Sequence, residues 1–75
     1  MKTARIKINQ SLDAITLDCD QNSNGHWSMI YQWKLAGKNG AQKNDVLKDA
    51  KAALFDETWS LSEMGYKVEV IPYIN

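Results

Sequence analysis

The stretch 27-WSMIYQWKL-35 decides the fold, because large apolar side chains alternate in it with mostly polar ones. Ile30 is the single exception to the alternation. Successive side chains of a strand point to opposite faces, so a period of two predicts a strand with one buried and one hydrated face. We expect the central strand of an antiparallel sheet, with a helix packed on the face that carries the odd positions. Those positions are Trp27, Met29, Tyr31, Trp33 and Leu35.

Two shorter strands precede this stretch. Residues 4–8 and 15–19 both alternate apolar and polar side chains, and the residues between them are typical of a turn. A tight hairpin centred on residues 11–12 would place Arg5 opposite Asp18 on the hydrated face. Charge and apolar pattern would then select the same register.

A second turn is predicted at 21-QNSNG-25, since Asn and Gly tolerate positive φ angles. If this hairpin closes about Ser23, Leu17 lies opposite Met29 and Ile15 opposite Tyr31. All apolar side chains would then share one face of a three-stranded meander.

The second half of the chain predicts one long helix and a last strand. We interpret residues 36–43 as a loop and expect the helix to begin near Asp45, with Asn44 as the N-cap and Gly65 as the stop. The strand 66-YKVEVIPYI-74 should return parallel to the first strand and lie beside it, giving the order 3-2-1-4. Pro72 cannot donate a ladder hydrogen bond and favours an edge. The sequence therefore predicts one α+β domain of the form β-β-β-α-β.

Glu57 conflicts with a regular helix, because a continuous spiral places it on the buried arc beside Leu54 and Leu61. Either the helix is interrupted between Asp56 and Ser60, or it continues and Glu57 turns toward the sheet. A buried catalytic carboxylate is disfavoured, since no second acid, histidine or nucleophile is evidently placed beside it.

Composition excludes several classes of protein. The 75 residues carry nine basic and nine acidic side chains, so no overall field draws the chain toward nucleic acid or anionic lipid. Its lone cysteine, Cys19, alternates with apolar neighbours and is predicted to be a buried, inert thiol. We see no signal peptide or membrane span and expect a cytoplasmic protein.

One segment resembles part of a calcium loop. Residues 20–25 match the front half of the EF-hand pattern, in which Asp20, Asn22 and Asn24 would supply ligand oxygens. Tyr31 stands where the loop needs its bidentate glutamate, and the flanks are predicted strands. We therefore favour a hairpin turn and predict no metal and no cofactor.

A nucleic-acid interface is the alternative function. Three antiparallel strands followed by a helix can lay a sheet in a DNA groove, and Arg5, Lys7 and Lys34 would share the hydrated face. Asp18 opposes them, and phosphate binding needs more cations than three.

The favoured prediction is a small protein that is not an enzyme and that binds another protein or itself. Phe55 and Trp59 are four residues apart and share a stripe of the predicted helix, away from its apolar arc. Either a kink returns Trp59 to the core, or the exposed pair anchors an interface. Interaction or inhibitor modules carried by phages and mobile elements are of this size and type, which is an association only.

Overall fold

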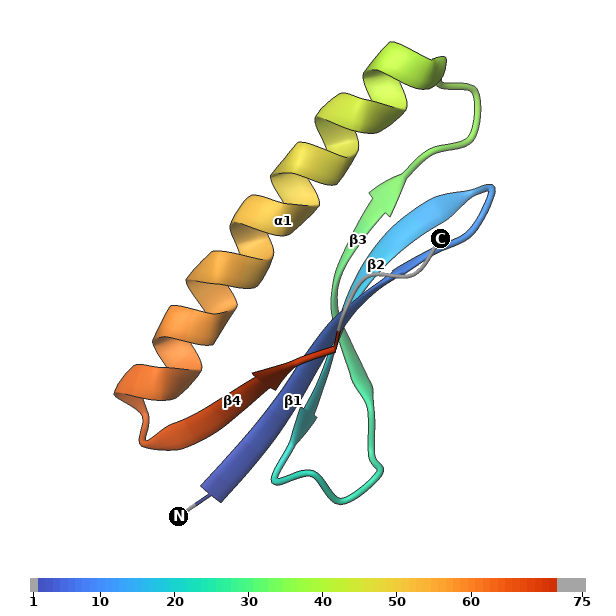
Figure 1. Cartoon of the computed structure of the whole chain (residues 1–75). Coiled ribbons are helices and arrows are strands. Elements are labelled where there is room, and N and C mark those ends of the chain that lie inside the picture. The colour runs from blue at the N-terminus through green and yellow to red at the C-terminus, as the bar shows by residue number, and fades with distance from the viewer. Residues whose placement is uncertain (1, 72–75) are drawn as a thin grey trace.

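Two layers, a four-stranded sheet and one long helix, make up the fold of the computed structural model, which describes residues 2–71 (Figure 1). The predicted α+β architecture is confirmed, with a mixed sheet. In chain order the elements are β1 (Lys2–Gln10), β2 (Ala14–Gln21), β3 (Ser28–Lys34), α1 (Gly40–Glu63) and β4 (Tyr66–Val70).

The sheet has the order β3-β2-β1-β4, as predicted, with β4 parallel to β1. Hydrogen bonding between them continues at Ile71, whose amide donates to the Ile6 carbonyl at 2.8 Å. Pro72 and the last predicted strand residues lie outside the described residues. Because β3 lies at the other edge, our prediction of a central strand for 27–35 was wrong. Alternation reports burial of one face and does not tell how many neighbours a strand has.

The first hairpin has a register two residues away from the predicted one. Arg5 lies opposite Asp20, and Lys7 takes the place opposite Asp18. The turn sets this register, since the Ser11 amide donates to the Ala14 carbonyl at 2.9 Å. A shift of two leaves every side chain on its predicted face.

A β-bulge changes the faces in the second hairpin. Leu17 lies opposite Tyr31, while its neighbour Asp18 lies opposite Met29, so Ile30 is an extra residue on β3. The predicted pairing of Leu17 with Met29 was therefore wrong. A bulge turns the strand so that alternation fails across it. Met29 consequently leaves the helix side, and Ile30 joins Tyr31 there.

Trp27 lies on the open face, which we define as the sheet face opposite α1. The centroid of its ring is 5.0 Å from the Arg5 guanidinium carbon and 4.0 Å from Lys7 Nζ. Since Arg5 and Lys7 belong to β1, the indole spans β2. The prediction that Trp27 and Met29 face the helix was wrong.

The rest of the predicted face is correct. Leu35 is buried in the core, Trp33 packs against it, and Tyr31 donates a hydrogen bond to α1.

The helix begins five residues earlier than predicted, at Gly40, with Asn39 as its N-cap in place of Asn44. Asn39 and Gln42 form a capping box, in which the side-chain oxygen of each residue accepts a hydrogen bond from the backbone amide of the other at 2.9 Å. The predicted stop is confirmed, because Gly65 has a φ of 93° directly after the C-cap Met64.

Helix α1 runs through residues 56–60 without interruption and packs on β1, β2 and β4. Two clusters of buried side chains fill the space between the helix and the sheet, and each includes a residue of the helix. The larger holds Ile6, Ile8, Ile15, Leu17, Leu35 and Ala50, and the smaller holds Ala4, Cys19, Leu61 and Tyr66. Edge strand β3 therefore receives little cover from the helix, and its side chains are the most exposed of the sheet. Within residues 2–71, no helix has the length and apolar character that crossing a membrane requires.

Candidate binding surfaces

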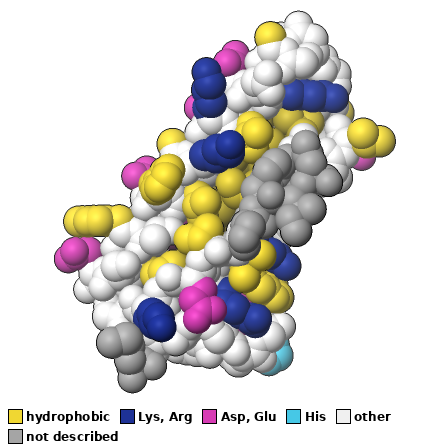
Figure 2. Space-filling view, in the orientation of Figure 1, with side chains coloured by type: hydrophobic (Ala, Val, Ile, Leu, Met, Phe, Trp, Pro, Cys, Tyr) yellow, Lys and Arg dark blue, Asp and Glu magenta, His cyan; other side chains and the backbone are white. Residues whose placement is uncertain are grey.

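Phe55 and Trp59 form an aromatic pair on the outer side of α1. They are 74% and 67% exposed, whereas Ala50 and Leu61 on the opposite side are buried. The uninterrupted helix explains this, because Trp59 precedes Leu61 by two residues, or about 200° of rotation. Figure 2 shows hydrophobic side chains standing out into solvent from the helical layer.

Charges divide the two flanks of α1. Asp49, Asp56 and Glu63 follow one another at intervals of seven residues and so lie on one stripe. This stripe lies on the β3 side of the helix, where Glu57, the residue after Asp56, accepts a hydrogen bond from Tyr31 of that strand. The pKa of Tyr31 is raised first by this hydrogen bond and the charge of Glu57, and also by the nearby charge of Asp56. Lys51 lies on the other flank by the same helical geometry, whereas Lys48, seven residues before Phe55, lies on the aromatic stripe itself. The helix thus has an acidic side facing β3.

Glu57 bridges the helix and the edge strand. The Tyr31 hydroxyl donates a hydrogen bond to its carboxylate at 3.2 Å. That hydrogen bond, followed by the negative charge of Glu57, raises the pKa of Tyr31. The continuous helix therefore turns Glu57 toward the sheet, and a polar partner on β3 accommodates it.

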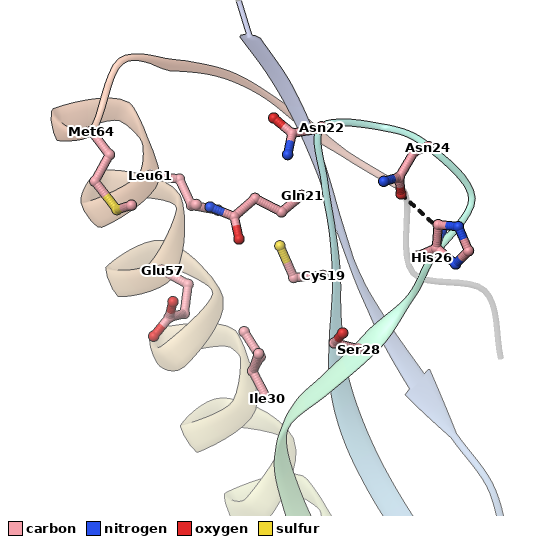
Figure 3. A pocket seen from close by; sticks show the side chains of 10 residues that line it. All are labelled: Cys19, Gln21, Asn22, Asn24, His26, Ser28, Ile30, Glu57, Leu61 and Met64. Atoms are coloured by element: carbon pink, nitrogen blue, oxygen red, sulfur yellow. Dashed lines mark hydrogen bonds between the residues drawn. The ribbon is translucent and has the colours of Figure 1, made fainter.

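A hollow of about 460 Å³ opens between the start of β3, the end of β2 and the last turns of α1. Cys19, Ile30 and Leu61 point toward it from these three elements, and Glu57 lies at its helical wall (Figure 3). The polar rim is formed mainly by the second turn, including Asn24 and His26. Ser28, which we expected on the hydrated face, also lines this hollow. We did not predict the hollow, although the break in alternation at Ile30 was its visible signal.

The thiol in this hollow is a poor nucleophile. Burial raises the pKa of Cys19, and the carboxylates of Glu57 and Asp20 raise it further. A thiol held protonated in this way reacts slowly. The predicted buried, inert cysteine is confirmed as to burial.

The calcium-like segment uses its carboxylate to hold the turn. Asp20 is fully buried and forms an ion pair with Arg5. Its carboxylate also accepts hydrogen bonds from the backbone amides of Asn24 at 3.1 Å and Gly25 at 2.9 Å. Asn22 adopts a φ of 71°, as a turn residue can. Oxygens that a cation would need are thus committed to the protein. Residues 2–71 contain no cluster of three or more acidic, histidine or cysteine side chains suited to a metal ion.

Acid should weaken the fold through Asp20. Burial acts to raise the pKa of Asp20, but the bonds from Arg5, Gly25 and Asn24 outweigh it and hold that pKa below its usual value. The stabilisation is therefore present above about pH 4 and lost as pH falls through the folded-state pKa. We expect the melting temperature of Asp20→Asn to lie below the parent's near neutral pH. The difference in melting temperature between the parent and the variant should narrow below about pH 4. A difference that does not change with pH would show that the charge of Asp20 does not contribute to stability.

The three cations of the nucleic-acid prediction do not form one patch. Arg5 is paired with buried Asp20, and Lys7 lies over the Trp27 ring. Lys34 lies opposite Ala14, near the other end of the sheet. The open face therefore separates Lys34 from Arg5 and Lys7, which lie over the same Trp27 ring and are already engaged by the protein.

Comparisons with protein-family models, curated proteins and solved structures find no match to this chain.

Proposed function

We propose that the protein is a cytoplasmic interaction or inhibitor module, without catalytic activity of its own, that docks a protein surface through Phe55 and Trp59. The observation that carries this proposal is the exposure of two large aromatic side chains one helical turn apart. Aromatic residues are enriched among the anchors of protein interfaces. A small domain gains nothing in stability from leaving such a pair in water.

The surroundings of the pair support an interface. Carboxylates flank it on one side and Lys51 on the other, and Lys48 continues its stripe toward the start of the helix, so a partner would meet an apolar centre with a charged rim. The same arrangement would suit either a different protein or a second copy of this chain.

Less supports the nucleic-acid alternative. Arg5 and Lys7 are engaged by Asp20 and Trp27, and Asp18 stands among them. Phosphate binding of useful strength requires several free cations on one surface. Titration of labelled duplex DNA at low salt is expected to show only weak binding that does not depend on Phe55 or Trp59.

The double variant Phe55→Ser, Trp59→Gln tests the proposal. We expect an unchanged circular dichroism spectrum and melting temperature, since both side chains lie outside the core. Sedimentation of the parent would report self-association, and a partner captured from the host would be purified and titrated. Two anchors contribute about 2 kcal/mol or more each, so binding should weaken by on the order of a thousandfold.

Leu12→Ser is the matched control, because Leu12 is an apolar side chain 86% exposed in the first turn. It should leave both fold and binding unchanged. If the double variant binds as the parent does, the pair is not the anchor. If the double variant unfolds, the pair belongs to the fold and the proposal fails.

A further inference from the structure

We propose that the free edge of β3 and the hollow beside it bind an extended segment of a partner protein, which places a lysine or arginine side chain in the hollow. This surface is separate from the Phe55 and Trp59 pair, and the inference does not depend on that pair.

The backbone of β3 offers unpaired groups at its outer edge. The Leu35 amide donates to the Asp13 carbonyl of the first turn at 2.7 Å, so Leu35 turns its backbone groups toward β2. Backbone groups alternate in direction along an antiparallel strand. Those of Lys34 and Gln32 therefore point away from β2, and no strand among residues 2–71 lies beyond them. An added strand satisfies such groups, which is the chemistry of β-strand addition.

The side chains of β3 do little to discourage an added strand. Edges are usually blunted by proline, charge or cover from another element. Residues 28–34 contain no proline, their one charge is Lys34 at the end, and α1 packs on the other three strands. Met29 and Tyr31 remain 58% and 45% exposed on opposite faces.

The hollow selects the side chain that enters it. Its floor is apolar, formed by Ile30, Leu61 and Cys19, while Glu57 supplies a carboxylate at the wall and Asp56 adds negative charge nearby. None of the residues that line it is a lysine or arginine. Long basic side chains place an aliphatic stem on apolar surface and keep the charge at a polar tip. Figure 3 shows Cys19, Ile30 and Leu61 around this space, with Glu57 on its helical wall.

A second copy of the chain is a worse occupant. Two β3 strands paired antiparallel about a two-fold axis would bring both α1 helices to the same sheet face. Their acidic stripes, Asp49, Asp56 and Glu63, would then face each other. Like charges in this position disfavour the dimer, whereas a basic segment complements them.

Titration of the isotope-labelled full chain with two peptides tests the inference by NMR. One probe is acetyl-Thr-Val-Lys-Val-Thr-amide, and its control carries Glu in place of Lys. We expect saturable shifts at the amides of Gln32 and Lys34 with the lysine peptide. The lysine peptide should bind about fivefold more tightly than the control, because a partly exposed ion pair changes affinity by about that factor.

Two variants distinguish the contribution of the β3 backbone to peptide binding from the contribution of the Glu57 charge. Gln32→Pro removes an outward amide without removing a bond to β2 and should abolish the shifts, while Gln32→Ala should retain them. Proline is tolerated at such an edge position. Glu57→Gln keeps a hydrogen-bond acceptor for Tyr31 and should remove the preference for the lysine peptide.

Equal binding of both peptides, or shifts confined to the Phe55 and Trp59 face, would overturn the inference. The absence of amide shifts at millimolar peptide would also overturn it. A doubling of the parent's mass in solution that Gln32→Pro abolishes would overturn it too, since the edge would then bind a second copy. The Phe55→Ser, Trp59→Gln variant should bind the lysine peptide as the parent does. Failure of the one surface is thus distinguishable from failure of the other.

Discussion

Replacing Leu17 with alanine is expected to reduce the free energy of unfolding by about 2–5 kcal/mol. Leu17 is fully buried on β2, an inner strand, and belongs to the larger core cluster. Its removal loses apolar contacts and leaves a cavity that the surrounding β-sheet cannot close. The free energy of unfolding of a whole domain is only about 5–15 kcal/mol, and that of a domain this small should be near the lower limit.

Urea denaturation followed by circular dichroism measures this loss. Leu12→Ala is the matched control, since it deletes the same atoms from a side chain that is 86% exposed. The control should change stability by less than about 0.5 kcal/mol. Equal effects of the two substitutions would contradict the burial assigned to β2.

Trp33→Ala is expected to cost about 2–3 kcal/mol, less than the 3–5 kcal/mol of a fully buried tryptophan. Trp33 is half-buried at the edge of the core and stacks on Tyr31 with ring centroids 5.6 Å apart. Substitution therefore removes both core contacts and an aromatic pair.

Trp27→Ala supplies the comparison, because Trp27 is also half-buried but lies on the open face over Arg5 and Lys7. Exposed cation–π contacts contribute about 0.5–1 kcal/mol each, so its loss should cost less than that of Trp33. Urea midpoints rank the two variants. A larger cost for Trp27 would show that the face assignment on either side of the bulge is wrong.

Local alternation sufficed to predict the first three strands, and the connections between the strands predicted the order of the sheet. Ile6, Ile15 and Leu17 are buried as their spacing indicated. Registers were harder, since a shift of two residues satisfies the same apolar pattern. Only the backbone bonds of the Ser11 turn distinguish the two alternatives.

The bulge accounts for the largest error. One inserted residue reverses the face of everything before it, so Trp27 and Met29 left the predicted face together. Ile30 was the one apolar residue out of phase. Ile30 is the residue inserted by the bulge, and it lines the hollow.

At the helix start, two local signals competed. Asn39-Gly40 is a strong hairpin pair, but Gln42 three residues after Asn39 completes a capping box. Because no strand follows, the cap prevails. The exposure of Phe55 and Trp59 followed from angle alone once the helix proved continuous. Their role as an interface stays a prediction.

The pairing of β1 with β4 also bears on how the protein is made. A ribosome delivers β1 first and residues 66–70 only after the whole of α1, yet these two strands are neighbours in the sheet. Until then one side of β1 has no partner, and α1 lacks one of the strands on which it packs. The nascent chain can therefore form the three-stranded meander while still attached, but the native sheet must wait until residues 66–70 have been synthesised. In that interval chaperones would meet the open edge of β1, which β4 covers in the finished sheet.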